Sequence, residues 1–456
     1  MIAPMKRFAP LVLVLALSIL PLTADDLHIV GGQFFDLESV RPNPGILIRA
    51  GRIHTIGNLD PAQDGDRTLK LADDEVLLPG LIDLHAHYNM TLNKKRREEF
   101  AGMPVLYLAN GATSTFPAGS YDPDAMIAMR KRIDRGEQVG PRVFNSGPYF
   151  GPARPGWDRD MDPDVLRTEV DRWAERGVAG IKVKRISARH LAVVVERAHR
   201  HGLTVTGHLD SGFRDTINPR DAIALGIDRV EHFLGGDAMP AERSAYDSFP
   251  DIRTDSASFH RIVAQFLGQH VYFDATLSAY GYFGDRAEGY DQWTDERRFF
   301  TPYARELTAG RRQRIDRFGN IFRIKLKTVK AFYDAGGGDL LTLGTDHNSA
   351  GEYLPGFSVH RELHAYVMAG LPPAAALRAG TINGARALGL ADRLGSIVVG
   401  KWADLFVVAG NPLEDIRHTR NVRHVIKAGE RYDPAALLKS VENSIGPRDE
   451  SELGDW

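Results

Sequence analysis

The sequence predicts an α/β protein, a (β/α)8 TIM barrel with a small β-sandwich domain built from the N- and C-terminal segments. Three observations support this class. Between residues 79 and 389, apolar strand-like runs alternate with longer helical patterns. Potential ligands and catalytic groups recur there at the interval of one strand and one helix, and short strand-and-turn segments flank the region on both sides. Such alternation is typical of parallel strands covered by helices.

Composition limits the classes of function. The chain has 456 residues, of which 43% are hydrophobic and 25% charged, which is typical of a soluble globular protein with a large core. Its formal net charge is −2, so no field of one sign would attract nucleic acid or a membrane surface. There are no cysteines, which excludes disulfides and thiolate metal ligands. Any metal must therefore be held by histidines, carboxylates or a modified side chain.

Residues 1–24 are predicted to be a secretory signal peptide. Lys6 and Arg7 form a basic start, residues 11–20 form an apolar run, and Ala24 marks a plausible cleavage site. The apolar run is short for a bilayer, which needs about 20 residues. We therefore expect an exported protein, periplasmic or secreted, without stable membrane insertion after cleavage. An uncleaved anchor and the choice of start codon stay open.

Two β-rich segments at the ends of the chain predict a second, small domain. Residues 25–78 contain short strands and a hairpin over residues 44–57 that turns at Ala50-Gly51. Residues 390–433 show the same pattern of short strands and turns. Neither segment is large enough for a core of its own, so we expect them to pair, with the barrel of residues 79–389 inserted between them. Residues 434–456 form a C-terminal tail that begins with a short helix and ends in polar and acidic residues.

The barrel region contains recognisable strands and helices. The expected strands are residues 179–184, 203–208, 229–233 and 340–346, with helices over 189–201 and 219–225. No glycine-rich turn follows the first strand, which disfavours a doubly wound dinucleotide-binding sheet.

Spacing places several polar residues at equivalent strand ends. Lys182 and His208 lie 26 residues apart, and His208 and His232 lie 24 apart, so each interval is one βα unit. The stretch from His232 to Asp346 is too long for two units and predicts an insertion. Residues 278–293, which are aromatic and polar, are either a surface loop within it or a lid over the barrel mouth.

His85 and His87 are the strongest single signal. On a β-strand, residues i and i+2 point to the same face, so the two imidazoles can converge on one cation. Asp83 is in phase with both and could fix the tautomer of one ring. Because strand ends meet at one face of a barrel, we expect a set of metal-competent groups there: His85, His87, Lys182, His208, His232 and Asp346. A protonated lysine is a poor ligand, so Lys182 fits only as an anionic carbamate.

Several motifs together carry a family resemblance. They are Pro79–His87, Gly180–Lys182, Thr206–His208, Val230–His232, Gly344–Asp346, Thr381–Leu388 and Leu394–Val407. Over residues 26–432 the chain resembles the metal-dependent amidohydrolase superfamily, and it is most similar to the imidazolonepropionase-related and prolidase-like branch, which includes Xaa-Pro dipeptidases.

The resemblance implies a binuclear metal site. Two divalent ions are implied, zinc first, with manganese, iron or cobalt as alternatives. His85, His87 and Asp346 would hold the more buried ion and His208 and His232 the second, while Lys182, as N6-carboxylysine, would bridge them with a hydroxide. Asp346 would be the general acid/base. The implied activity is hydrolysis of an amide bond in a dipeptide or N-acyl amino acid.

Other interpretations stay open. The first is a mononuclear deaminase or cyclic-amide or lactone hydrolase of the same superfamily with unmodified Lys182, and the second is an inactive scaffold. Lys184 is in phase with Lys182 and could take the bridging position or bind a substrate carboxylate. With Lys184, the candidate substrate contacts are Tyr88, Arg185 and Tyr280. A homo-oligomer is possible, and the expected partner is a small amide or dipeptide.

Overall fold

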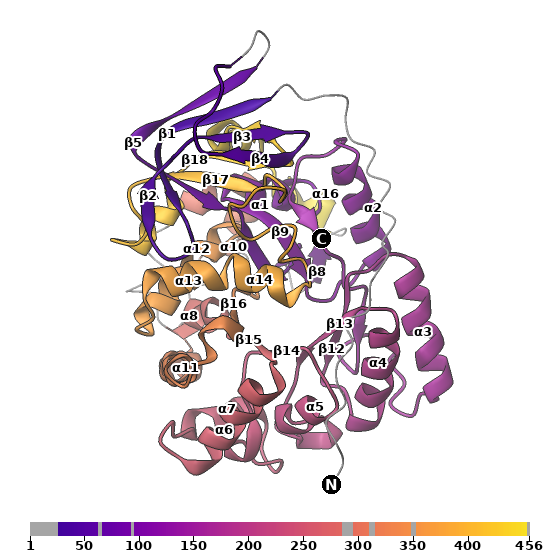
Figure 1. The fold of residues 1–456 in the computed structure, drawn as a ribbon. Helices are drawn as coiled ribbons and strands as arrows, with labels where there is room; N and C mark the ends of the chain where they lie inside the picture. Colours follow the sequence, from indigo (N-terminus) through magenta and orange to yellow (C-terminus); the bar gives the residue numbers. More distant parts are fainter. Residues whose placement is uncertain are drawn as a thin grey trace.

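The computed structural model describes residues 26–62, 66–92, 95–284, 295–309, 315–347 and 353–453. The predicted signal peptide therefore lies outside the described residues. Within the described part, no helix combines the length and apolar character needed to cross a membrane. Figure 1 shows a layer of strands through the middle of the molecule, helices along its outer sides, and a separate sheet at the top.

Parallel strands form the centre of the fold. Their bounds are Leu81–Ala86 (β6), Ala112–Pro117 (β9), Arg142–Val143 (β10), Tyr149–Phe150 (β11), Gly180–Lys184 (β12), Thr204–His208 (β13), Arg229–Glu231 (β14), Tyr272–Asp274 (β15) and Leu341–Thr342 (β16). They make one sheet of order β10-β9-β6 and another of order β11-β12-β13-β14-β15-β16. A small hairpin of Asn89–Leu92 (β7) and Lys95–Glu98 (β8) follows β6.

The α/β class is confirmed, but the described strands form two parallel sheets and not one continuous closed ladder. Backbone hydrogen bonds join the sheets at both seams. The Leu84 amide donates to the Leu343 carbonyl at 2.9 Å, and the Ala179 amide donates to the Asn145 carbonyl at 2.7 Å. The ladder is interrupted because β10 and β11 are separated by a turn at Gly147, where φ is 70°, and because β16 has only two residues.

Helices surround these strands. Their bounds are Gly102–Ala109 (α1), Pro123–Asp134 (α2), Pro163–Glu175 (α3), Ala188–Arg200 (α4), Pro219–Ala224 (α5), Ala245–Ser248 (α6), Ala257–Gln269 (α7), Leu277–Gly284 (α8), Pro302–Thr308 (α10), Asp316–Asp334 (α11), Phe357–Met368 (α12), Pro373–Ala379 (α13), Ile382–Ala387 (α14), Pro434–Ser440 (α15) and Glu450–Leu453 (α16). The predicted helices over 189–201 and 219–225 correspond to α4 and α5.

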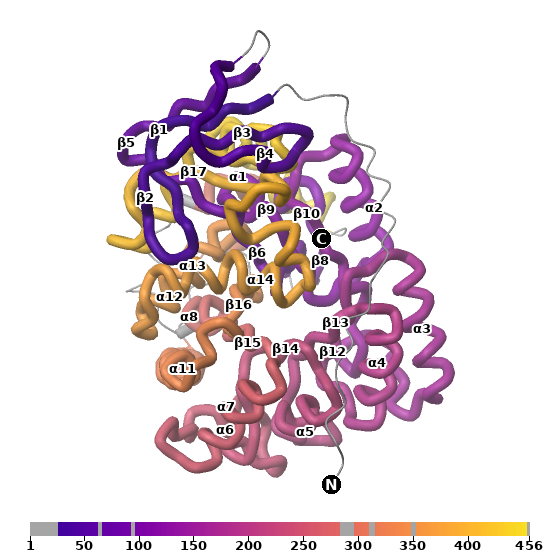
Figure 2. Tube along the Cα trace, in the orientation of Figure 1, coloured from indigo at the N-terminus to yellow at the C-terminus, as the bar shows by residue number. Residues whose placement is uncertain are grey.

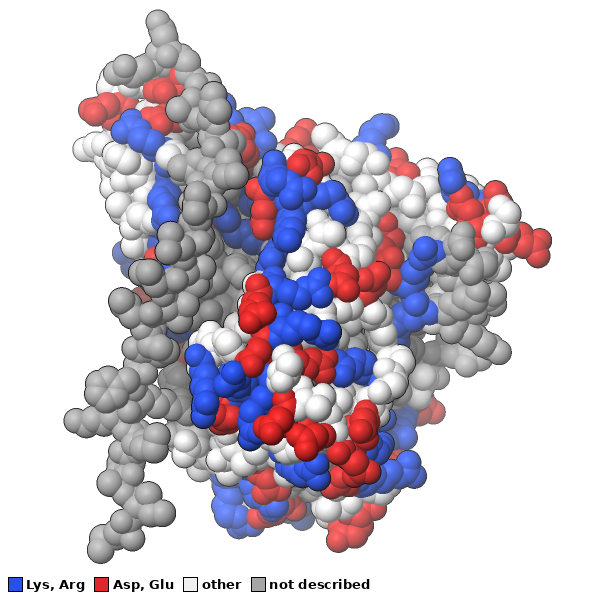
Figure 3. All heavy atoms as spheres, turned by 90° about the vertical axis from the view of Figure 1, so that its right-hand side faces the viewer, with Lys and Arg blue, Asp and Glu red and all other residues white. Residues whose placement is uncertain are grey.

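The outer helices follow from amphipathic sequence patterns. In α3, Leu166, Val170 and Trp173 are buried at helical spacing, and the helix begins at an Asp162 cap followed by proline. The solvent side of α2, α3 and α4 carries ion pairs such as Arg167–Asp164. Figure 3 shows basic and acidic side chains intermingled on this face, so the surface has no extended field of one sign there.

The two ends of the chain combine into one mixed sheet. Its strands are Leu27–Phe35 (β1), Val40–Pro42 (β2), Ile46–Arg49 (β3), Arg52–Ile56 (β4), Arg67–Pro79 (β5), Leu405–Ala409 (β17), Val422–Lys427 (β18) and Glu430–Tyr432 (β19). β17 pairs with β5, so segments from opposite ends of the sequence lie side by side, as Figure 2 shows. The predicted hairpin is β3–β4, and it turns at Ala50 and Gly51, both with positive φ.

The predicted β-sandwich is not what the structure shows. All strands of this domain belong to a single sheet of order β19-β18-β17-β5-β1-β3-β4, with β2 paired to β1. The sheet curls back on itself. The Ile53 amide donates to the Lys401 carbonyl at 2.9 Å, and the Ala403 amide donates to the Gly51 carbonyl at 2.9 Å. These bonds join β4 to the segment that enters β17. A second apolar core lies against the curled sheet.

The long interval between His232 and Asp346 contains β15 and several extra helices, among them α6, α7, α8, α10 and α11. The expectation of a loop over residues 278–293 is wrong for its first part. Leu277–Gly284 is the helix α8, and Tyr280 within it is only 2% exposed. Residues 285–294 lie outside the described residues. Apolar and aromatic side chains at helical spacing pack α8 against α11, which the aromatic composition alone did not indicate.

Candidate metal centre

The first strand presents two histidines to a buried site. His85 lies in β6 and His87 just beyond it, with their ring centres 5.1 Å apart, and both side chains are buried. Asp83 has a different role from the one expected. Its Oδ1 accepts the His85 amide at 3.0 Å, and its Oδ2 accepts the Thr345 hydroxyl at 2.7 Å. Asp83 therefore ties the first strand to the last and does not orient an imidazole ring; burial raises its pKa to about 6.

Asp346 is the carboxylate at which the histidines meet. It follows β16 with φ of 41°, and its amide donates to the His85 carbonyl at 3.0 Å. Its Oδ1 lies 3.0 Å from Nε2 of His87 and 3.5 Å from Nε2 of His85. Its Oδ2 lies 3.9 Å from Nε2 of His232. One carboxylate thus reaches imidazoles from two other strands.

Strands β13 and β14 bring a second pair of histidines. His208 ends β13 and His232 follows β14, and their ring centres are 4.1 Å apart. Nδ1 of His232 lies 2.7 Å from Thr276 Oγ1. With its proton on Nδ1, the ring donates to that hydroxyl, and Nε2 is the free lone pair. This Nε2 is buried and has no hydrogen-bond partner among the described residues.

These groups fit a divalent cation. Ligand atoms of His85, His232 and Asp346 all lie within 4.8 Å of one another. Burial holds the pKa of His85, His208 and His232 well below the ordinary value, so the rings are neutral, as metal binding requires. The pKa of Asp346 is well below its usual range although burial opposes this, because any positive charge on His85 and His232, and the hydrogen bond with His87, favour the ionised carboxylate.

Lys182 reaches the same site from β12. The side chain is 1% exposed, and its Nζ lies 3.4 Å from Nε2 of His85. Its main partner is Glu231 of β14, which forms a buried ion pair with it and also accepts the Thr206 hydroxyl at 2.8 Å. Burial lowers the pKa of Lys182, and Glu231 opposes the shift.

The sequence analysis missed three charged residues beneath the site. Glu231 and Asp274 place carboxylate oxygens 3.4 and 3.7 Å from Nδ1 of His85, and Arg229 donates to the Leu84 carbonyl at 2.9 Å. Burial raises the pKa of Asp274 well above its ordinary value. Strand alternation would have put Glu231 and His232 on opposite faces, but the chain turns at His232, where φ is 67°. For Asp274 the sequence offered one signal, an aspartate at the end of an apolar strand.

The predicted substrate contacts separate into two groups. Lys184 ends β12 with Nζ 5.2 Å from the Tyr149 ring centre, and burial lowers its pKa to about 8. The Tyr280 ring lies 6.2 Å from that of His232. These two residues are near the site. Arg185 is exposed on a left-handed backbone, and Tyr88 is fully buried with its hydroxyl 2.8 Å from that of Thr115, so the Tyr88 side chain faces the core.

Comparison with known proteins agrees with this geometry. The model of the amidohydrolase family matches residues 322–432, which include Asp346. Over these residues the chain is similar to the amidohydrolase family. It is 34% identical to a probable imidazolonepropionase of Nematostella vectensis over 116 residues, 24% of this chain and 26% of that protein. It is 21% identical over 390 residues to an N-acetylglucosamine-6-phosphate deacetylase of Bacillus subtilis (strain 168), covering 80% of this chain and 88% of that protein.

Solved structures extend the likeness to the fold of most of the chain. A Xaa-Pro dipeptidase with bound methionine superposes with a TM-score of 0.66 at 21% identity, covering 90% of this chain and 100% of that one. A putative prolidase from Bifidobacterium longum gives a TM-score of 0.68 at 22% identity, covering 92% of this chain and 99% of that one. At this identity the likeness shows a shared fold.

Proposed function

We propose that this protein is a metal-dependent hydrolase that cleaves the C–N bond of a small amide, either a dipeptide or an N-acyl amino acid. One observation carries the proposal: neutral imidazoles of His85, His87 and His232 surround the Asp346 carboxylate where parallel strands end. Similarity to the amidohydrolase family over residues 322–432 supports hydrolysis of a C–N bond. The dipeptidase and prolidase among the solved structures of the same fold favour a peptide-like amide.

The chain's own groups suit this chemistry. A divalent cation bound at this site would polarise the scissile carbonyl and lower the pKa of a water molecule. The ionised Asp346 carboxylate can accept the proton of the attacking water at an oxygen atom and then return it to the leaving amine nitrogen. Lys184 is the last residue of β12 and, unlike the four residues before it, is partly exposed. Its ammonium group can pair with the carboxylate of an amino-acid product.

The number of metal ions separates two candidate functions. The 4.1 Å approach of the His208 and His232 rings supports a second ion beside the first, and we propose two. The ion pair between Lys182 and Glu231 instead favours a single ion and an unmodified lysine, as in a mononuclear deaminase or cyclic-amide hydrolase. In that case Lys182 would remain bound to Glu231 in the active enzyme.

A metal count and a substrate panel test the proposal. The purified chain is reconstituted with Zn²⁺ or Mn²⁺, analysed for bound metal, and assayed on dipeptides, N-acyl amino acids, lactams and amino-substituted rings. We expect two ions per chain and hydrolysis of a linear amide. Asp346→Asn should reduce turnover by about 10²- to 10⁴-fold, the range for loss of a general acid–base. His260→Ala, an exposed histidine on α7, is the matched control and should leave both measurements unchanged.

Lys182→Ala then tests the bridge. Under the binuclear proposal this variant binds less metal as well as losing turnover. Unchanged metal content would contradict a bridging role for Lys182. One ion per chain together with turnover of a lactam or an amino-substituted ring would favour the mononuclear candidate. Full metal occupancy without turnover of any amide, lactam or amino-substituted ring would contradict both.

A further inference from the structure

We propose that Lys325 is a positioning residue that holds His232 in the orientation needed to bind metal. Lys325 lies in the middle of α11, outside the parallel strands that supply the candidate ligands. The proposal rests on the proposed function, because it takes His232 to be a ligand. It adds a residue that no sequence motif indicated and that contacts His232 at the main-chain carbonyl, not at the imidazole.

The contact is direct. Lys325 is 1% exposed, and its Nζ donates a hydrogen bond to the main-chain carbonyl oxygen of His232. Burial lowers the pKa of Lys325 to about 7. The hydrogen bond needs only an N–H group, so it can form in either protonation state of the amine.

Packing alone does not explain a lysine at this position. The surroundings of Nζ are aromatic: it lies 4.5 Å from the ring centre of Tyr280, 4.8 Å from that of Phe233 and 5.7 Å from that of Phe249. Ring faces favour a cation, but an apolar side chain of similar volume would fill the same space without the cost of removing an amine from water. Among the described residues, the carbonyl of His232 is the acceptor to which this nitrogen donates.

His232 is a residue that needs such support. Its φ of 67° is left-handed, a conformation that non-glycine residues adopt only when their surroundings hold it. Its amide donates to the Asp274 carbonyl at 2.8 Å, and its Nδ1 contacts the Thr276 hydroxyl at 2.7 Å. Lys325 supplies the third anchor, on the carbonyl. Together the three anchors occupy every polar atom of His232 except Nε2, which faces Asp346.

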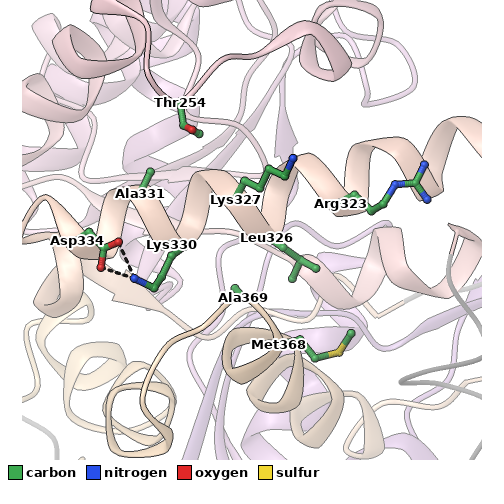
Figure 4. Close-up of a pocket in the computed structure, with 9 residues that line it drawn as sticks. All are labelled: Thr254, Arg323, Leu326, Lys327, Lys330, Ala331, Asp334, Met368 and Ala369. Carbon is green, nitrogen blue, oxygen red and sulfur yellow. Dashed lines mark hydrogen bonds and ion pairs between the residues drawn. The ribbon is translucent and has the colours of Figure 1, made fainter.

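Without the hydrogen bond from Lys325 to its carbonyl, His232 should relax toward negative φ. That change would turn the imidazole ring away from Asp346. The test is Lys325→Met, which keeps the length and volume of the side chain but removes the donor. The matched control is Lys327→Met, on the same helix. Lys327 is exposed, whereas Lys325 is buried. Figure 4 shows Lys327 on α11 among the residues that line a pocket, with Lys330 and Arg323.

Two readouts separate positioning from stability. The first is the affinity for Zn²⁺, measured by competition with a chelator, and the absorption spectrum of the Co²⁺-substituted protein. The second is the thermal midpoint of the metal-free protein. We expect Lys325→Met to weaken metal binding by about 10- to 100-fold and to alter the Co²⁺ spectrum, as for loss of a ligand's supporting contact. The metal-free midpoint should not fall, and Lys327→Met should match the wild type throughout.

A second pair of variants tests another of the contacts that hold His232. Thr276→Val removes the hydroxyl beside Nδ1, while Thr276→Ser keeps it. Thr276→Val should weaken metal binding in the same direction, and its combination with Lys325→Met should cost less than the sum of the two, since both act through His232. If Lys325→Met does not fold, Lys325→Gln replaces it; its shorter side chain does not reach the carbonyl, and the same loss of affinity is expected.

The outcomes are distinguishable. Wild-type affinity and spectrum in the folded Lys325 variant overturn this inference alone. A lowered metal-free midpoint with unchanged affinity also overturns it, because Lys325 would then be structural. A wild-type chain that binds no metal overturns the proposed function, and this inference with it.

Discussion

At the residue scale, Glu362 on α12 shows how burial couples a single carboxyl group to pH. It is fully buried, and its Oε1 and Oε2 accept the amides of Leu277 at 2.8 Å and Ser278 at 2.6 Å, which fixes the start of α8. Burial raises its pKa from 4.5 to about 7. The folded chain therefore binds a proton at Glu362 more tightly than the unfolded chain does.

The sign of the resulting pH dependence follows directly. A raised folded pKa contributes stability that is fully present below pH 4.5 and is lost as the pH rises through about 7. The free energy of unfolding of the wild type should therefore fall by up to about 3 kcal/mol, relative to Glu362→Gln, between pH 4.5 and pH 8. Denaturant unfolding at several pH values measures this difference.

The free energy of unfolding of Glu362→Gln will differ from that of the wild type by an amount that does not depend on pH, because an amide offers only one acceptor oxygen to the two backbone donors. The slope of the difference against pH is the informative quantity. Glu38→Gln, an exposed glutamate, is the control and should run parallel to the wild type. Parallel curves for Glu362→Gln as well would show that this carboxyl group titrates alike in the folded and unfolded chains.

At the scale of elements, Asn218 connects the loops that follow two ligand-bearing strands. It caps α5, with Oδ1 accepting the amides of Arg220 at 3.0 Å and Gly236 at 2.9 Å. Its Nδ2 donates to the carbonyls of Ser211 at 3.1 Å and Met239 at 3.3 Å. Ser211 follows His208, and the segment from Gly236 to Met239 follows His232. One buried side chain thus holds both loops in register.

Loss of this side chain should destabilise the protein more than loss of an ordinary cap. Asn218→Ala leaves buried backbone donors and acceptors without partners, and should lower the free energy of unfolding by about 2–4 kcal/mol. Asn218→Asp keeps the oxygen that caps the helix but loses the Nδ2 donors, so its free energy of unfolding should remain well below that of the wild type. Urea unfolding monitored by circular dichroism provides the measurement.

The matched control is Asp122→Ala, which removes the exposed cap of α2 and should cost about 1 kcal/mol. Equal losses at Asp122 and Asn218 would mean that Asn218 acts only as a cap, and that the loops after β13 and β14 are held by other contacts.

At the scale of the whole molecule, Asp404 joins the curled sheet to the parallel strands. Its Oδ2 lies 2.5 Å from Nε of Arg142, which belongs to β10, and its Oδ1 accepts the Ala428 amide at 2.7 Å. The Arg142 guanidinium also lies 4.3 Å from the centre of the Trp402 ring. The Asp404 carbonyl accepts the Gly80 amide at 2.8 Å, at the point where the chain passes from the sheet into the first parallel strand.

Breaking this junction should destabilise both parts together. Asp404→Ala leaves the largely buried Arg142 without its carboxylate, and should lower the free energy of unfolding by about 3 kcal/mol. Asp255→Asn, which removes one member of an exposed ion pair with Arg253, should cost less than about 1 kcal/mol. Calorimetry checks both values. A loss at Asp404 no larger than that at Asp255 would show that apolar packing alone holds the two parts together.

The sequence by itself determined the alternation of strands and helices and the pairing of strands from the two chain ends. The six candidate ligands that it indicated stay a prediction. Local rules carry this information: the period of apolar residues defines each element, and a regular βα interval places Lys182, His208 and His232 at strand ends. Figure 1 shows α4 and α5 where these patterns put them.

Only the tertiary structure decided the remainder. It turned the expected sandwich into one curled sheet, because whether two strand edges meet depends on sheet twist and not on local pattern. It also brought Glu231, Asp274 and Lys325 to the candidate site, since a left-handed turn at His232 and the packing of α11 place side chains that strand alternation assigns elsewhere. Contacts between residues about 50 to 150 positions apart carry no local signal, so the supporting shell of the site appears only in the folded chain.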